Sequence, residues 1–291
     1  MRGLLERGED VRVLDNFSTG SRRNLDGLDI EVIEGELRSY ERVHNAVRGV
    51  DVVYHLGALG SVPSSVQDPL TSSAVNIEGT LNVLLAARDA GVRRVVYSSS
   101  SSVYGTRKEL PVTELTPTDP ISPYGVAKLA AERYCVSLSR VYPPLETVVL
   151  RFFNVFGPRQ SPLSQYAAVV PLFVTAIGHE EPITIEGDGE QSRDFTFVSN
   201  VVDASIRAAH AEGASGRIFN VSSGSPSTVN ALADAIGEII GKPVTRQFAP
   251  ARTGDIRDSW ADIAAARESL GFQPSVDLHE GLRRTVDDLL G

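Results

Sequence analysis

A short apolar run that ends in consecutive serines is the feature that most constrains the fold of this chain. Val95 to Tyr97 are apolar or aromatic, and five serines, Ser98 to Ser102, follow directly. A short continuous apolar run before polar residues is typical of a strand buried on both faces of a parallel sheet. Open parallel sheets bind their ligands at the carboxyl ends of the strands. The serines therefore predict a functional edge, although a polar strand end without a catalytic role would look the same.

A helix with a tyrosine and a lysine is predicted after the serines. Ser122 and Pro123 form a typical helix start, and Tyr124 and Lys128 lie four residues apart, which places them on one helix face. A phenol has a reference pKa of about 10 and is a poor base at neutral pH, but a neighbouring ammonium favours the phenolate. Lys128 could therefore tune Tyr124 to accept and return a proton. The alternative is two ordinary neighbours on a half-exposed helix.

Together, the serine run and this helix resemble the extended short-chain dehydrogenase/reductase family, and within it the nucleotide-sugar 4-epimerases. The family pattern S-S-S-x-x-V-Y-G followed by Y-x-x-x-K is matched by Ser98, Ser99, Ser100, Val103, Tyr104, Gly105, Tyr124 and Lys128. The resemblance extends from Leu5 to Leu290. It implies an α/β fold with a Rossmann-type doubly wound parallel sheet, and a smaller mixed α/β C-terminal domain that binds substrate. It also implies that the catalytic residues are Ser100, Tyr124 and Lys128.

Composition argues against several other classes of function. The chain has 291 residues, 42% of them hydrophobic and 22% charged, which is ordinary for a globular protein. Its net charge of −9, with no basic block, argues against nucleic acid as a partner. Cys135 is the only cysteine, so no internal disulfide or cysteine-based metal centre can form, and no metal site is expected. No apolar run approaches ~18 residues and no signal peptide is recognisable, so we expect a cytoplasmic protein with no membrane partner.

An early acidic residue indicates the cofactor. A short predicted strand over residues 11–14 ends at Asp15. In dinucleotide-binding folds, an acidic residue at the end of the second strand accepts hydrogen bonds from the adenosine ribose hydroxyls. The next three residues, Asn16-Phe17-Ser18, include no arginine that could hold a 2′-phosphate, which favours NAD over NADP. The alternative is an aspartate that only opens the turn before Asn16.

The resemblance implies further contacts with NAD at the ends of other predicted strands. A strand from Ile30 to Ile33 leads to residues that contact adenine in the family. A strand from Val52 to Leu56 leads to a segment like the family's H-L-A-A, whose backbone runs near the pyrophosphate, and a strand from Val148 to Phe153 ends beside the nicotinamide. With the asparagine that begins N-I-E-G-T-L-N-V-L-L, the implied cofactor residues are Asp15, Asn16, Glu36, Leu37, Leu56, Gly57, Ala58, Asn76, Ser98, Tyr124, Lys128 and Phe153.

The glycine-rich turn of dinucleotide-binding folds has no counterpart near the start of this chain. Residues 1–8 form the tail of a predicted helix, and the only G-x-G, Gly187-Asp188-Gly189, lacks a third glycine and lies far downstream. In the family's sheet the first strand is central, between the second and fourth. We therefore expect about 20 to 25 residues upstream, the usual length of a strand, a glycine-rich turn and a helix start. A chain without them could be inactive.

The regular alternation of strands and helices ends near Phe156, which predicts two domains. We expect an NAD-binding domain over residues 1–156 and a substrate-binding domain over residues 157–291. Two arginines, Arg193 in R-D-F and Arg252 in R-x-G-D, are expected to bind the diphosphate, because a guanidinium can contact phosphate oxygens bidentately. Outside these motifs each would be an ordinary surface arginine. The resemblance implies a substrate site made of Ser100, Tyr124, Asn154, Val170, Arg193, Arg252, Asp255 and Ser259.

Two positions narrow the reaction that the resemblance implies. Sugar dehydratases and decarboxylases of this group carry an acid two residues after the catalytic serine or threonine, where this chain has Ser102. This difference favours NAD-dependent epimerisation of a UDP-hexose at C4, through a transient 4-keto sugar. Ser259 stands where some epimerases carry a tyrosine, and a small side chain should leave room for an N-acetyl group. The expected substrates are therefore UDP-glucose and UDP-galactose, and also UDP-GlcNAc and UDP-GalNAc.

Several alternatives stay open. A UDP-glucuronate 4-epimerase would share the segment S-S-S-S-V-Y-G. A non-catalytic remnant that binds a nucleotide sugar belongs to another class, and the intact Ser100, Tyr124 and Lys128 argue against it. A reductase that releases its nicotinamide would consume NADH. The resemblance also implies a homodimer through the helices that start near Asn76 and Tyr124, although their apolar faces equally fit packing on the sheet.

Overall fold

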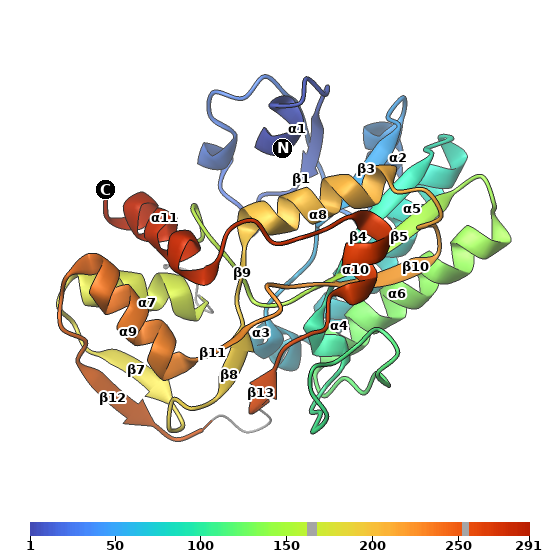
Figure 1. Cartoon of the computed structure of the whole chain (residues 1–291). Helices are drawn as coiled ribbons and strands as arrows, with labels where there is room; N and C mark the ends of the chain where they lie inside the picture. The colour runs from blue at the N-terminus through green and yellow to red at the C-terminus, as the bar shows by residue number, and fades with distance from the viewer. Residues whose placement is uncertain (162–167, 252–255) are drawn as a thin grey trace.

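The computed structural model describes residues 1–161, 168–251 and 256–291, and a parallel sheet lies at its centre (Figure 1). Its four strands are ordered β10-β5-β4-β3, and all three pairings are parallel. The strand predicted from the apolar run is β4, which lies between β3 and β5 and continues into the serines. The bounds are Val52–His55 for β3, Arg94–Ser100 for β4, Glu146–Phe152 for β5 and Arg217–Val221 for β10.

Helices cover both faces of this sheet, which confirms the doubly wound fold. Successive strand residues point to opposite faces, so β4 sends Val95 and Tyr97 to one side and Val96 to the other. The first side packs against α2 (Tyr40–Val47), α5 (Gly79–Asp89) and α6 (Pro123–Val141). The second packs against α8 (Val198–His210) and α10 (Ala264–Leu270). The continuous apolar run in β4 follows from burial on both faces.

The N-terminal strands form a separate parallel pair. In register, β1 (Arg12–Asp15) pairs with β2 (Glu31–Glu34), and the short helices α1 (Arg2–Leu5) and η1 (Arg22–Leu25) flank them. In the described part of the chain, no ladder joins β1 to β3. The sheet is thus interrupted between β1 and β3. This is the expected place of the strand that precedes a glycine-rich turn in dinucleotide-binding folds.

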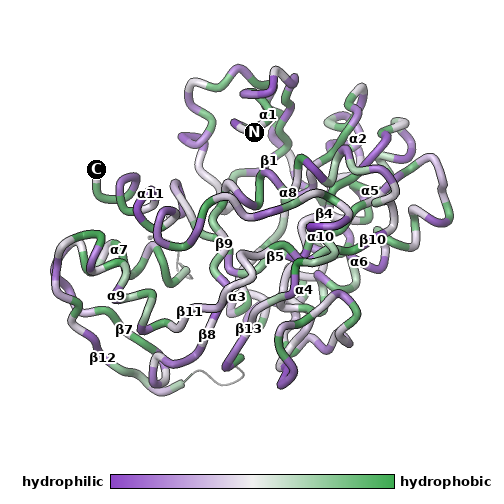
Figure 2. The backbone as a smooth tube through the Cα atoms, in the orientation of Figure 1, coloured by the Kyte–Doolittle hydropathy of each residue, from purple (hydrophilic) through white to green (hydrophobic). Residues whose placement is uncertain are grey.

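A smaller lobe has its own apolar core, where α7 (Val169–Gly178), α9 (Val229–Ile240) and α11 (Leu278–Leu290) pack together. Figure 2 shows hydrophobic stretches along α7 and α9, which face this core. The strands of this part are β6 (Val155–Phe156) with β9 (Thr196–Phe197), β7 (Ile183–Glu186) with β12 (Arg246–Ala249), and β8 (Ser192–Asp194) between β11 (Pro226–Thr228) and β13 (Asp258–Ser259).

The chain returns to the large sheet after residue 156. Strand β10 pairs with β5, and α8 and α10 cover one face of that sheet, although all three follow Phe156 in the sequence. The boundary near Phe156 therefore marks where the chain first leaves the sheet, and the sheet needs later residues to be complete. No helix in the three described ranges is long and apolar enough to cross a membrane.

Candidate active site

The end of β4 and the start of α6 bring the predicted catalytic residues together. Ser122 caps α6, because its hydroxyl accepts a hydrogen bond from the Gly125 N–H at 3.1 Å. Tyr124 and Lys128 then lie on the helix face that meets β4. Ser100 ends the strand; its hydroxyl donates to the Ser102 hydroxyl at 3.1 Å and is close enough to the Tyr124 phenol to influence the pKa of that phenol. A serine hydroxyl and a phenol thus lie side by side at the carboxyl end of a central strand, where open sheets bind ligands.

Lys128 is anchored under this pair. Its ammonium group donates to the Ser98 carbonyl at 2.7 Å and lies 5.0 Å from the centre of the Tyr97 ring. Only 3% of the residue is exposed. Burial lowers the pKa of Lys128 to about 8, while the negative charge of Glu132 acts in the opposite direction. An ammonium has three donors, and the described residues supply one acceptor, which leaves donors for a ligand.

The pKa of Tyr124 departs from the expectation that its lysine neighbour lowers it. Burial raises the pKa of the phenol above its usual value of about 10, and the hydrogen bond with Ser100 opposes that rise. The lysine nitrogen lies 6.0 Å from the centre of the Tyr124 ring. In this structure the loss of water on burial therefore decides the direction of the Tyr124 pKa shift, and Ser100 is the neighbour that favours the phenolate.

The lowered pKa of Lys128 leads to a prediction for pH dependence. The ammonium form is present below about pH 8 and is lost as the pH rises through that value. If activity needs the cation, kcat/KM should fall above about pH 8 and stay level just below it. A Lys128→Arg variant keeps its charge and should show no such fall, whatever its absolute rate. A wild-type profile that stays flat to pH 10 would contradict the requirement for the cation.

The predicted NAD residues lie along the carboxyl edges of the strands. Asp15 ends β1 and accepts the Phe17 N–H at 2.8 Å, while the neighbouring Asn16 and Glu36 are exposed. Leu37, which follows β2, packs closely against the backbone of Gly57 in the loop after β3. A methyl group added at Gly57 would lie only 2.9 Å from the Leu37 Cδ1 atom. Leu56 is 59% exposed, although it is large and apolar. The Asp15 carboxylate, the close packing at Gly57 and the exposed apolar side chain of Leu56 are features that fit a bound dinucleotide. Ala58 follows Gly57 directly in the same loop.

Asn76 and Phe153 occupy positions that are more internal. Asn76 lies in a π-helical turn, η2 (Ala74–Glu78), that follows α3 (Val62–Gln67) and α4 (Pro69–Ser73). Its amide group accepts from the Leu59 N–H at 2.8 Å and donates to the Leu59 carbonyl at 3.0 Å. Asn76 thereby holds the loop after β3 in place. Phe153 is fully buried against Tyr104, and for both residues a direct contact with NAD stays a prediction.

The predicted substrate residues spread over both lobes. Asn154 has a positive φ of 29° and donates to the Asp194 carbonyl at 3.3 Å, which ties the end of β5 to β8. Arg193 on β8 is the register partner of Ser259 on β13, so these two predicted residues are neighbours. Val170 is buried in the core of the smaller lobe. Arg252 and Asp255 lie outside the described residues.

Sequence reasoning missed a set of buried polar residues directly behind this site. Glu132 on α6 and Arg151 on β5 form a buried ion pair, with bonds of 2.9 Å and 2.8 Å. The signals were a glutamate eight residues after Tyr124, on the same helix face, and an arginine inside the apolar run of β5. Charged residues at such positions are rarely buried unless they are paired, so Glu132 and Arg151 each needed an oppositely charged partner.

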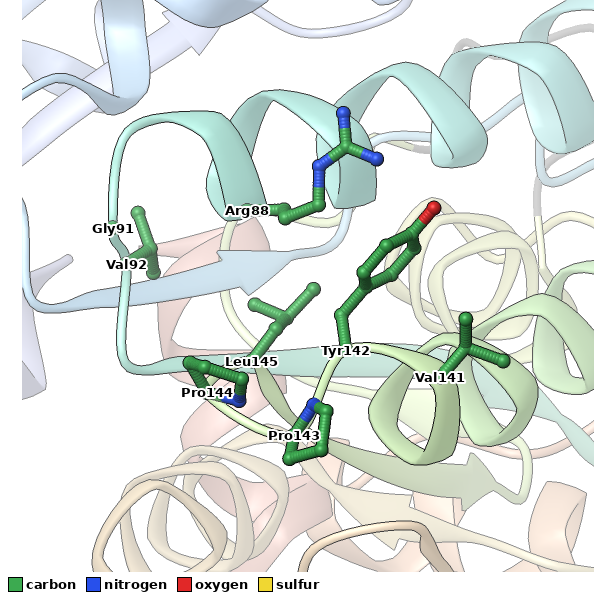
Figure 3. Close-up of a pocket in the computed structure, with 8 residues that line it drawn as sticks. All are labelled: Arg88, Gly91, Val92, Val141, Tyr142, Pro143, Pro144 and Leu145. Carbon is green, nitrogen blue, oxygen red and sulfur yellow. The ribbon is translucent and has the colours of Figure 1, made fainter.

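A separate hollow lies at the opposite end of the sheet (Figure 3). Its volume is about 270 Å³, and it adjoins the residues that lead into β4 and β5, whereas Ser100 ends β4. The Arg88 guanidinium lies 4.8 Å from the centre of the Tyr142 ring there. None of the predicted catalytic residues lines it, so this hollow is not the catalytic site. The lining residues are Arg88, Gly91, Val92, Val141, Tyr142, Pro143, Pro144 and Leu145.

Comparison with known proteins agrees with this geometry. The model of the NAD dependent epimerase/dehydratase family matches residues 1–222, which include the ends of β1 to β5 and the whole of α6. The chain belongs to this family. Members of the epimerase family use NAD, so the chain is an NAD-dependent enzyme, and the resemblance inferred from the serine run and the Tyr124 helix is confirmed.

Individual members of the epimerase family are similar over most of their length. A UDP-glucose 4-epimerase of Mycolicibacterium smegmatis is 38% identical over 98% of this chain and 92% of its own length. The crystal structure of UDP-glucose 4-epimerase from Thermotoga maritima, with UDP-glucose, has a TM-score of 0.94 at 36% identity and covers 99% of this chain and 93% of its own. A UDP-N-acetylglucosamine 4-epimerase from Methanobrevibacter ruminantium, in complex with UDP-N-acetylmuramic acid, has a TM-score of 0.91 at 37% identity, with coverages of 96% and 90%.

Proposed function

We propose that this enzyme interconverts UDP-sugars that differ in configuration at C4, with UDP-glucose and UDP-galactose as substrates. The observation that carries the proposal is the group of Ser100, Tyr124 and Lys128 at the end of β4, where Ser100 adjoins the Tyr124 phenol and Lys128 donates to the Ser98 carbonyl. Ser102 stands where the dehydratases and decarboxylases of the family carry an acid. Without that acid, no residue there would remove a proton from a carbon next to C4, so only C4 changes.

In this mechanism the side chains handle the proton and the sugar oxygen. Tyr124 reacts as the phenolate: its oxygen accepts the proton of the C4 hydroxyl, which makes the neutral phenol, and later returns the proton to the sugar. The Ser100 hydroxyl hydrogen-bonds to the same sugar oxygen, and Lys128 supplies a positive charge behind Tyr124. NAD, when bound, supplies the acceptor and then the donor of the C4 hydride. The 4-keto sugar turns between the two transfers, so that its other face receives the hydride and C4 is inverted.

Proton NMR of the product tests this proposal. The protein is incubated with NAD and, in separate tubes, UDP-galactose, UDP-N-acetylgalactosamine or UDP-glucuronate. A C4 epimer without net NADH consumption supports epimerisation and identifies the substrate. In a parallel set of tubes supplied with NADH in place of NAD, net consumption of NADH would indicate a reductase instead. The absence of product in every tube, with nucleotide sugar still bound in calorimetry, would support a non-catalytic binding protein. A product only from UDP-glucuronate would replace the hexose by the uronate.

We further propose that N-acetylated sugars are accepted, because Ser259 is small. Ser259 is partly buried beside Arg193, which is the predicted diphosphate ligand. Replacing Ser259 by tyrosine should abolish turnover of UDP-N-acetylgalactosamine, since the larger side chain occupies the space of the acetyl group, and should leave UDP-galactose turnover within about threefold. Ser259→Ala is the matched control and should convert both sugars. An equal loss of both activities in Ser259→Tyr would refute this role.

A homodimer is also proposed, through the helices that start near Asn76 and Tyr124, together with the short helix α4 that packs beside both of them. Large apolar side chains are exposed there, with Leu70 on α4 82% exposed and Val126 on α6 51% exposed. Exposed apolar patches of this kind commonly mark contacts with another protein. Replacing Leu70 and Val126 together by aspartate should give a monomer in light scattering after gel filtration, whereas Val32→Asp, on β2, should not. A wild-type monomer would contradict the proposal.

A further inference from the structure

A row of buried polar side chains crosses the sheet one residue before the catalytic serine. Ser99 on β4 is the register partner of Arg151 on β5, and Arg151 is the register partner of Asn220 on β10. Register partners point to the same face of a sheet. One step earlier along the strands, Tyr97 and Val149 on this face belong to the apolar core. The core therefore changes from apolar to polar directly behind the site.

Glu132 on α6 is the point where this row meets the helix. Its carboxylate accepts the Ser99 hydroxyl, which lies in a short hydrogen bond, and two N–H groups of Arg151 at 2.9 Å and 2.8 Å. The ion pair is excluded from water, with 0% of Glu132 and 1% of Arg151 exposed. The third guanidinium nitrogen of Arg151, Nη1, donates to the Tyr104 hydroxyl at 2.8 Å, and that hydroxyl donates to Asn220 at 2.6 Å.

The helix face and the strand end match one another residue by residue. Tyr124, Lys128 and Glu132 are spaced four apart, so they lie along one face of α6. The last three residues of β4 contact them one by one. Ser100 adjoins the Tyr124 phenol, the Ser98 carbonyl accepts from Lys128, and the Ser99 hydroxyl donates to Glu132. Glu132 is also the residue of this face that binds Arg151, through a planar, bidentate ion pair. This geometry is more directional than the single hydrogen bond made by Lys128.

Stability alone does not account for the buried pair. Removing two charges from water is costly, and well-packed apolar residues in place of a buried ion pair are often neutral or stabilising. A polar contact in the core, however, can select one arrangement among several of similar energy. We propose that Glu132 is a positioning residue, which Ser99 and Arg151 hold so that α6 keeps one register on β4. Through that register, Tyr124 and Lys128 keep their places against Ser100.

A triple variant separates positioning from stability. Ser99→Ala, Glu132→Leu and Arg151→Met together remove every charge and leave Tyr104 still bonded to Asn220, so no buried polar group loses all its partners. We expect a melting temperature no lower than that of the wild type. Because a misplacement of about 1 Å can cost roughly 10²-fold, kcat should fall roughly 10- to 100-fold with KM within about threefold. The kinetic isotope effect with C4-deuterated substrate should increase, since hydride transfer becomes slower.

Thr147→Val is the matched control for this variant. Thr147 is a fully buried residue on β5 whose hydroxyl donates to the Cys135 carbonyl of α6 at 2.8 Å, so it joins the same two elements farther from the site. Its kcat should stay within about twofold of the wild type. A triple variant that keeps wild-type kcat overturns the proposal. If the triple variant does not fold, Ser99→Ala alone decides: a fall in kcat of about threefold or more supports the proposal, and an unchanged kcat overturns it.

The inference rests on the proposed function, and one measurement does not depend on turnover. If the wild type converts no nucleotide sugar, the proposed function fails, while crystal structures of the wild type and the triple variant still test the register. We expect the 2.7 Å bond from Lys128 to the Ser98 carbonyl to be lost in the triple variant and kept in Thr147→Val. An intact bond in the triple variant overturns the proposal.

Discussion

Replacing Tyr124 by phenylalanine is expected to lower kcat for the C4 epimerisation of UDP-galactose by about 10²- to 10⁴-fold, the usual contribution of a positioned acid or base. The variant loses the phenol oxygen that accepts the C4 proton and keeps the ring. Since Ser100 is the one side chain that influences the Tyr124 hydroxyl in the described structure, the packing of α6 should survive. The measurement is steady-state kinetics on the purified variant, with its melting temperature and bound NAD recorded alongside.

Tyr134→Phe is the matched control for this substitution. Tyr134 lies on the same helix, two turns and more beyond the site, and is 40% exposed. Its kcat should stay within about twofold of the wild type, because surface substitutions rarely matter. A Tyr124→Phe variant that retains a tenth or more of the wild-type kcat would show that another group moves the C4 proton.

Replacing Arg151 by methionine is expected to lower the free energy of unfolding by about 3 to 5 kcal/mol. The single substitution leaves the Glu132 carboxylate buried and without its cation, and an uncompensated buried charge has a cost of this size. This outcome is the opposite of that expected for the charge-free triple variant, in which no lone charge remains. Urea unfolding at neutral pH, followed by circular dichroism, measures the difference.

An exposed ion pair provides the comparison for Arg151. Arg207 pairs with Asp203 one turn earlier on α8, where both side chains are substantially exposed. Arg207→Met should change the free energy of unfolding by less than about 1 kcal/mol, since water screens such pairs. Equal effects of the two substitutions would mean that the burial of the Glu132–Arg151 pair contributes little.

The sequence predicted elements well where a local pattern was strong. The apolar run before the serines is β4, and the Ser122-Pro123 start is the beginning of α6. These signals depend on side-chain periodicity and capping within a few residues, so they are visible without the fold. The boundary near Phe156 shows the limit of such reasoning. Strand β10 joins the large sheet by pairing with β5, and no local pattern states which strands pair.

The predicted site likewise divides into a local and a non-local part. Tyr124 and Lys128 could be placed on one helix face because the spacing of four residues is a property of the helix itself. Their joint position against Ser100, the bonds from Asn76 to Leu59, and the direction of the Tyr124 pKa shift depend on packing between distant segments. The pKa expectation was wrong because it counted the neighbouring charge and omitted the loss of water, which is set by burial.

By itself, the sequence determined the main strands before Phe156, the serine edge, the Tyr124 and Lys128 face, and the family to which the chain belongs. Each of these is encoded in residues that are close in the chain or in a fixed motif. Only the tertiary structure decided that Glu132 and Arg151 form one buried pair behind the site, and that Ser99, Arg151 and Asn220 lie in one row. The physical reason is that a buried charge requires a partner, while the choice of partner depends on strand register and helix packing.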